Sequence, residues 1–170
     1  MAFWRFTSVL LILATGGVAG RGQSSPVNRP WPPGVQPVSN ESPVLPPEEA
    51  QKTFFMPPGY RLELVASEPL VQDPTIMDWD LRGRLWVTEM TGFVRDLDTE
   101  EPLLEPIGRV VVVEDTNQDG RMDKRTVFAD RLILPRALKV LDDGVLVGEP
   151  GTLWWMRDTN GDLQVDEREV

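Results

Sequence analysis

Residues 108–117 have the sequence GRVVVVEDTN, and residues 151–160 have the sequence GTLWWMRDTN. Both stretches begin with a glycine, continue as a run rich in residues with β propensity, and end in the same Asp-Thr-Asn triplet. Asp115 and Asp158, which open the two triplets, are 43 positions apart in the chain. One blade of a β-propeller occupies about 40 to 50 residues. The spacing therefore favours a propeller over a sandwich or a barrel.

Other short segments around this repeat also have β patterns. Residues 83–87 and 144–147 are glycine-led candidate strands, each placed before one copy of the repeat. Residues 61–64 alternate polar and apolar side chains, and residues 126–128 form a further short candidate strand. We expect an all-β fold. Because a closed propeller needs about four to eight blades and two related units are visible, we expect an incomplete propeller that is the N-terminal part of a larger one.

The chain is predicted to contain three regions. Residues 1–20 have the layout of a secretory signal peptide, with Arg5 before an apolar run and small residues near Gly20. An uncleaved N-terminal membrane anchor is the alternative. Residues 21–46 form a linker rich in Pro and Ser, which we expect to be disordered. Residues 47–170 are the folded part, and they are expected to open with a short helix from Pro47 to Phe54.

The composition excludes several classes of function. The formal net charge of −10 makes nucleic acid an unsuitable partner and makes cations the natural counter-charge. The chain has no histidine, so a Ser-His-Asp hydrolase or a histidine zinc site cannot be built from these residues alone. The chain also has no cysteine, which removes disulfides, thiolate metal sites and haem attachment from this stretch.

Each copy of the repeat leads into an aspartate-rich loop of the calcium-binding type. Both loops place side-chain oxygens at positions one, three, five and nine, and a backbone carbonyl at position seven can add one more ligand. Neither loop is a complete EF-hand, and an acidic turn without metal is the alternative interpretation. The predicted calcium ligands are Asp115, Asn117, Asp119, Arg121, Asp123, Asp158, Asn160, Asp162, Gln164 and Asp166.

Several segments together carry a resemblance to a known family. Residues 57–71, with the sequence PPGYRLELVASEPLV, and residues 83–90 and 114–124 resemble the membrane-bound dehydrogenase domain of planctomycete-type haem-binding proteins. Residues 126–130 and 158–162 resemble the same domain, so that the likeness extends over about 47–170. This domain is similar to the soluble quinoprotein glucose and sorbosone dehydrogenases, which are six-bladed propellers.

The resemblance implies an exported protein of the periplasm or cell envelope that oxidises sugars or alcohols with pyrroloquinoline quinone. Longer members carry a cytochrome c module, whose haem signature of two cysteines and a histidine is not found in this chain. Because only the first blades are expected here, the fragment alone is expected to be inactive. A non-catalytic, calcium-stabilised propeller for adhesion or carbohydrate binding is the alternative.

Four further residues could belong to a catalytic site. Glu89 ends a predicted strand, where propeller sites gather side chains, although a solvated or hydrogen-bonded structural acid is the favoured interpretation. Trp86, Trp154 and Trp155 could stack on a flat cofactor, but at strand spacing they are expected to pack between blades. Trp154 and Trp155 are adjacent, so they should point to opposite faces of their strand.

Overall fold

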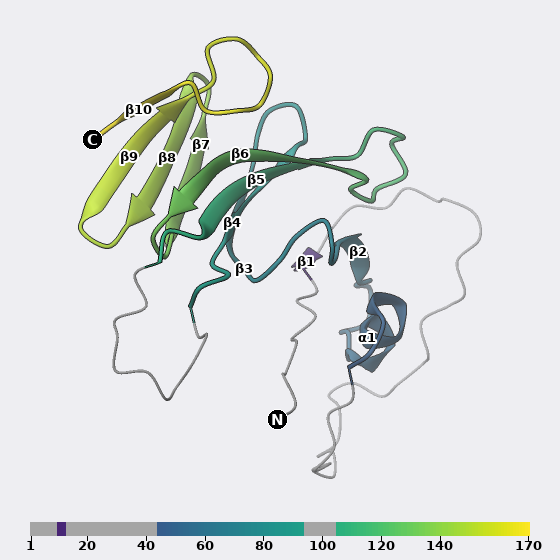
Figure 1. The fold of residues 1–170 in the computed structure, drawn as a ribbon. Helices are drawn as coiled ribbons and strands as arrows, with labels where there is room; N and C mark the ends of the chain where they lie inside the picture. The colour runs from purple at the N-terminus through teal and green to yellow at the C-terminus, as the bar shows by residue number, and fades with distance from the viewer. Residues whose placement is uncertain (1–9, 13–43, 94–104) are drawn as a thin grey trace, which may run out of the picture.

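The computed structural model describes residues 10–12, 44–93 and 105–170, and these residues form two antiparallel sheets, a strand pair and one helix (Figure 1). The first sheet contains β3 (Pro74–Trp79), β4 (Leu85–Glu89), β5 (Gly108–Glu114) and β6 (Lys124–Leu132). The second sheet contains β7 (Ala137–Leu141), β8 (Gly144–Glu149), β9 (Thr152–Arg157) and β10 (Glu167–Glu169). The strand pair contains β1 (Leu10–Ile12) and β2 (Glu63–Ala66), and the helix is α1 (Pro47–Thr53).

Both sheets are simple meanders. Each strand pairs antiparallel with the strand that follows it in the chain, so the spatial order of each sheet is its sequence order. Short connections such as the Asp80–Arg84 turn make this possible. The Asp80 carboxylate accepts hydrogen bonds from the Arg82 and Arg84 amides, at 2.9 Å each. The expectation of a β-rich fold is therefore confirmed for the described residues.

The helix α1 also confirms its prediction. Pro47 lies in the first turn, where a missing amide hydrogen has no consequence. Glu48 and Glu49 favour the N-terminal end electrostatically, and the Lys52 ammonium lies 2.6 Å from the Glu49 carboxylate. The helix ends at Thr53, before the Pro57-Pro58 pair.

Several strands have bounds that differ from the prediction, and four of the described strands were not predicted. The predicted strand 61–64 lies instead at 63–66, and the predicted strand 126–128 extends over 124–132. Three of the four unpredicted strands, β3, β7 and β10, are edge strands of the two four-stranded sheets, and the fourth, β1, lies within the predicted leader. One side of an edge strand makes no backbone hydrogen bonds to a neighbouring strand. An edge strand can therefore begin with a proline and can lack a continuous apolar run. This explains why Pro74, which begins β3, obscured the pattern.

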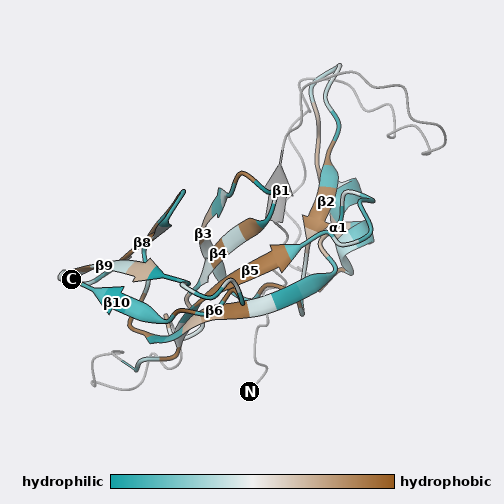
Figure 2. Cartoon of the chain, turned by 90° about the horizontal axis from the view of Figure 1, so that it is seen from above, coloured by the Kyte–Doolittle hydropathy of each residue, from teal (hydrophilic) through white to brown (hydrophobic). Residues whose placement is uncertain are grey.

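The four consecutive valines of β5 explain how the layers are held together. Val110 and Val112 point into a core shared with the second sheet, whereas Val111 and Val113 point into a core shared with β2. All four are fully buried because successive side chains of a strand point to opposite faces and both faces are covered. The first sheet is thus the middle one of three layers, as Figure 2 shows from above.

The core between the two sheets contains Trp86 and Trp154 of the three predicted tryptophans, and Trp155 is not among its members. Trp86 is 4% exposed and packs edge-on against Phe128, with ring centroids 4.8 Å apart. Trp154 packs against the same core. The further members of this core are Val145, Val147, Met156, Leu163, Ala129 and Leu132. The expectation that Trp86 and Trp154 pack between sheets is confirmed.

An ion pair also joins the two sheets. Lys139 Nζ and the Val140 amide of β7 both donate to Asp78 Oδ2 of β3, at 2.7 and 2.9 Å. Partial burial alone would raise the pKa of Asp78, but the hydrogen bonds from Lys139 and Val140 outweigh it and lower the pKa. The contact aligns the first strand of one sheet with the first strand of the next.

Most of the predicted leader and linker lies outside the described residues. Of residues 1–20 only Leu10–Ile12 is described, as β1, and of residues 21–46 only 44–46, which have no regular structure. The signal peptide and the disordered linker remain predictions. In the described parts of the chain, no helix is long and apolar enough to cross a membrane.

Candidate functional site

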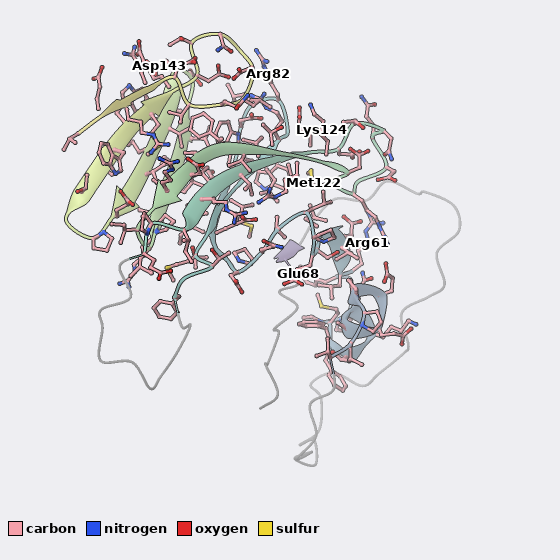
Figure 3. The ribbon with its side chains drawn as sticks, viewed as in Figure 1. Arg61, Glu68, Arg82, Met122, Lys124 and Asp143 are labelled. Atoms are coloured by element: carbon pink, nitrogen blue, oxygen red, sulfur yellow. The ribbon has the colours of Figure 1, made fainter. Side chains whose placement is uncertain are left out.

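The two aspartate loops occupy the same topological place. Residues 115–123 connect the third and fourth strands of the first sheet, and residues 158–166 connect the third and fourth strands of the second. Figure 3 labels Arg82 and Asp143, in the β3–β4 and β7–β8 turns, at the same rim of the sheets as the second loop. The repeat predicted from the sequence is therefore a repeat of structure.

In the first loop, every predicted side-chain ligand accepts a backbone amide. Asp115 Oδ2 accepts the Gly120 amide at 2.8 Å, and Asn117 Oδ1 accepts the Asp119 amide at 2.9 Å. Asp119 Oδ1 accepts the Arg121 amide at 2.8 Å. Asp123 closes the loop by accepting both the amide and the hydroxyl of Thr116, at 3.1 and 2.9 Å. The Arg121 guanidinium lies 3.5 Å from the Glu48 carboxylate of α1.

The second loop repeats these contacts position by position. Asp158 Oδ2 accepts the Leu163 amide at 2.8 Å, and Asn160 Oδ1 accepts the Asp162 amide at 2.9 Å. Asp162 Oδ1 accepts the Gln164 amide at 2.8 Å.

Asp166 Oδ2 accepts the amide and hydroxyl of Thr159, at 2.7 and 2.8 Å. The Thr159 amide, then its hydroxyl, lower the pKa of Asp166.

The backbone of the two loops also agrees. Positions four and six are left-handed in both: Gln118 and Gly120 have φ of 61° and 90°, and Gly161 and Leu163 have φ of 85° and 64°. Glycine stands at position six of the first loop and at position four of the second. The same turn is therefore made by two different placements of glycine, which the sequence pattern alone does not reveal.

Position eight of each loop binds the neighbouring layer. The Met122 amide donates to the Val65 carbonyl of β2 at 2.8 Å, and the Val165 amide donates to the Phe128 carbonyl of β6 at 2.9 Å. Met122 is buried against the β2 layer, and Figure 3 labels it in the loop between β5 and β6. The loops thus fasten each sheet to the layer before it, which agrees with the sequence-based prediction that they pin the blades.

Each carboxylate of the two loops accepts at least one backbone amide. Within residues 44–93 and 105–170, no group of three or more acidic side chains is arranged to hold a metal ion. Each loop nevertheless presents oxygen donors alone, which is the chemistry that Ca²⁺ requires. Calcium binding by the ten residues from Asp115 to Asp166 stays a prediction.

Glu89 lies at the opposite end of the first sheet and is fully buried. Its Oε1 accepts the Gln72 amide at 2.9 Å, and its Oε2 accepts the Arg125 guanidinium at 2.8 Å. The hydrogen-bonded structural acid is the interpretation that agrees with this geometry, and the solvated one is wrong. Arg125 is 36 residues away in sequence, so no local pattern pointed to the pair.

Glu149 is the counterpart of Glu89 in the second sheet. Both glutamates are the last residue of the second strand. Glu149 accepts the Ile133 amide and the Trp154 indole N–H. Gln72 and Ile133 both belong to the segment that leads into the first strand of a sheet. The two glutamates therefore hold equivalent connections between layers.

The chain belongs to one protein family. The model of the family described as "Domain of unknown function (DUF7133)" matches residues 46–170. No curated protein and no solved structure matches the chain. The family boundary agrees with the start of α1 at Pro47 and leaves the predicted leader and linker outside it.

Proposed function

We propose that this member of the DUF7133 family supplies the first blades of an exported, six-bladed β-propeller in which the two aspartate loops bind calcium. The observation that carries the proposal is the structural equivalence of the two loops. They share their place in the sheet, their left-handed positions and four side-chain contacts, although only part of their sequence is the same.

The arrangement of the layers supports the propeller part of this proposal. A propeller blade is a four-stranded antiparallel sheet that packs face to face against its neighbours. Both sheets have this order, and the first sheet is covered on both faces. The Met122–Val65 and Val165–Phe128 bonds show that adjacent layers meet by a repeated contact.

Calcium would add rigidity to the loops that make this contact. Each loop carries three aspartates and one asparagine within nine residues, and the Arg121 and Gln164 carbonyls lie at position seven. Three carboxylates in so short a loop repel one another, and a divalent cation relieves this repulsion. A cation bound at positions one to nine would therefore stabilise the contact that position eight makes with the next layer.

Calorimetric titration of the chain with Ca²⁺ tests the proposal. We expect two sites and a melting temperature that rises at millimolar calcium, because a ligand that binds only the folded state stabilises it. Asp119→Asn should remove one site and Asp162→Asn the other. Asp143→Asn, in a turn outside both loops, is the matched control and should keep both sites. Absence of heat and of any change in melting temperature would refute calcium binding.

We further propose, from the resemblance of residues 57–71 and 83–90, that the complete propeller is a dehydrogenase. It would oxidise sugars or alcohols with pyrroloquinoline quinone in the periplasm or cell envelope. Glu89 is an unsuitable catalytic base in this arrangement because it is buried and paired with Arg125. A dye-linked oxidation assay on the full-length protein, with and without the quinone, tests the activity. Failure of every sugar and alcohol to reduce the dye would favour the adhesive or carbohydrate-binding alternative.

A further inference from the structure

The strand β2 has the same relation to the first sheet that β6 has to the second. The carbonyl of Val65 in β2 and that of Phe128 in β6 each accept the position-eight amide of an aspartate loop in the following layer. The next residues along, Ala66 and Ala129, are both buried. β6 is the outermost strand of a four-stranded sheet. By position, β2 is the outermost strand of another such sheet.

The pairing of β2 with β1 repeats the pairing of β6 with β5. In the complete sheet, Val110 is opposite Ala129 and Val111 is opposite Val127, so the register skips Phe128. In the strand pair, Leu10 is opposite Ala66 and Leu11 is opposite Leu64, so the register skips Val65. The skipped residues are the same two whose carbonyls bind the aspartate loops. A bulge of this kind turns one carbonyl out of the ladder.

We infer that the edge of β2 that faces β1 is an acceptor site for an extended apolar strand, which completes a third sheet of the β5 type. The site recognises an antiparallel strand of several consecutive apolar residues through main-chain hydrogen bonds, as in strand addition. In this structure Leu10–Ile12 takes the place of that strand. The inference rests on the layer repeat that also underlies the proposed propeller, but it does not require calcium.

The occupant changes when the leader is removed. Leu10–Ile12 lies inside the predicted signal peptide of residues 1–20, so cleavage takes β1 away and leaves β2 without a paired strand among the described residues. An unpaired strand edge pairs readily with another strand. The occupant that we infer for the mature protein is therefore the third strand of a further sheet of the same propeller, with the apolar pattern of β5.

A binding experiment with a β5 peptide tests this acceptor site. The probe is a fluorescent peptide of residues 108–117, and its anisotropy is measured with the mature chain that begins at Arg21 and with the whole chain. We expect saturable binding to the mature chain and at least about tenfold weaker binding to the whole chain, whose own β1 competes. A Val111→Pro peptide removes one ladder hydrogen bond and should also bind at least about tenfold more weakly. Equal binding to both chains, or no binding to a mature chain with unchanged circular dichroism, would overturn the inference.

Cross-linking tests the register independently of any peptide. The natural chain has no cysteine, so a Leu11→Cys/Leu64→Cys variant contains a single possible disulfide, between residues that are Cα partners. We expect it to form under mild oxidation and to abolish peptide binding. Leu11→Cys/Arg61→Cys is the matched control, three residues out of register and beyond the reach of a disulfide. Equal cross-linking of both pairs would contradict the shared bulge. Calcium titration can fail while both of these results stand, so the two proposals are separable.

Discussion

At the scale of single residues, Glu89, which is fully buried, and Glu149, which is half-buried, show how one side chain can connect layers. Glu89 and Glu149 occupy the same strand position, and each accepts an amide from the segment that leads into its own sheet. They differ in their second partner, which is the Arg125 guanidinium for Glu89 and the Trp154 indole for Glu149. Only Glu89 therefore belongs to a buried ion pair, and this difference can be measured.

Glu89→Gln should destabilise the fold more than Glu149→Gln. Replacement of Glu89 leaves Arg125 without its charged partner, and breaking a buried ion pair from one side costs about 3 to 5 kcal/mol. Glu149→Gln keeps one acceptor oxygen and leaves one of two neutral N–H donors, that of Ile133 or that of Trp154, without an acceptor, so it should cost about 1 to 3 kcal/mol. Urea unfolding of both variants gives the comparison. A double variant, Glu89→Gln/Arg125→Met, should recover part of the loss, and equal losses for the two single variants would show that the ion pair is unimportant.

The sequence could predict some of these residues and not others. Trp86 and Trp154 were expected in the core because large aromatic side chains on strands bury well. The end of a predicted strand indicates Glu89 as a candidate, but its burial depends on Arg125 and on the segment around Gln72. These contacts join distant parts of the chain, and pattern analysis of one sequence does not reveal which distant residues meet.

At the scale of elements, the aspartate loops show that one backbone can be encoded in two ways. Both loops need left-handed residues at positions four and six, but each has glycine at only one of them. Gln118 and Leu163 adopt positive φ without the freedom of glycine, which carries a conformational cost. Leu163 has a compensation, because its side chain is buried in the core between the sheets. The exposed Gln118 has no such burial.

Introducing glycine at position four of the first loop and removing it from position four of the second should therefore change the free energy of unfolding in opposite directions. Gln118→Gly relieves the left-handed strain at a smaller entropic cost and should stabilise the chain by about 0.5 kcal/mol. Gly161→Ala should destabilise by about 1 kcal/mol, and only through the backbone, because nothing lies within 4 Å of the added Cβ. Thermal unfolding of the two variants measures both effects. Shifts of the same sign would mean that the two loops do not share one conformation.

At the scale of the whole molecule, the central sheet is the element on which the other layers depend. Its valines contribute to both cores, so neither the second sheet nor the β2 layer has a core of its own. The 43-residue repeat predicts blades from the sequence. It does not predict how strongly one blade stabilises its neighbour. The shared cores indicate that the sheets unfold cooperatively, because one set of side chains stabilises two sheets.

A substitution in the second sheet should consequently loosen the first. Val147 is fully buried in β8 and packs into the core between the sheets, so Val147→Ala should lower the free energy of unfolding by about 2 kcal/mol. Leu153→Ala in β9 of the same sheet is the matched control, since Leu153 is 55% exposed and should change stability by less than about 0.5 kcal/mol. Amide hydrogen exchange then reports each sheet separately. If the layers form one cooperative unit, Val147→Ala reduces protection in β4 and β5 as much as in β8 and β9. If only β8 and β9 lose protection, the sheets are independent, and a propeller whose blades stabilise one another is the wrong description of this chain.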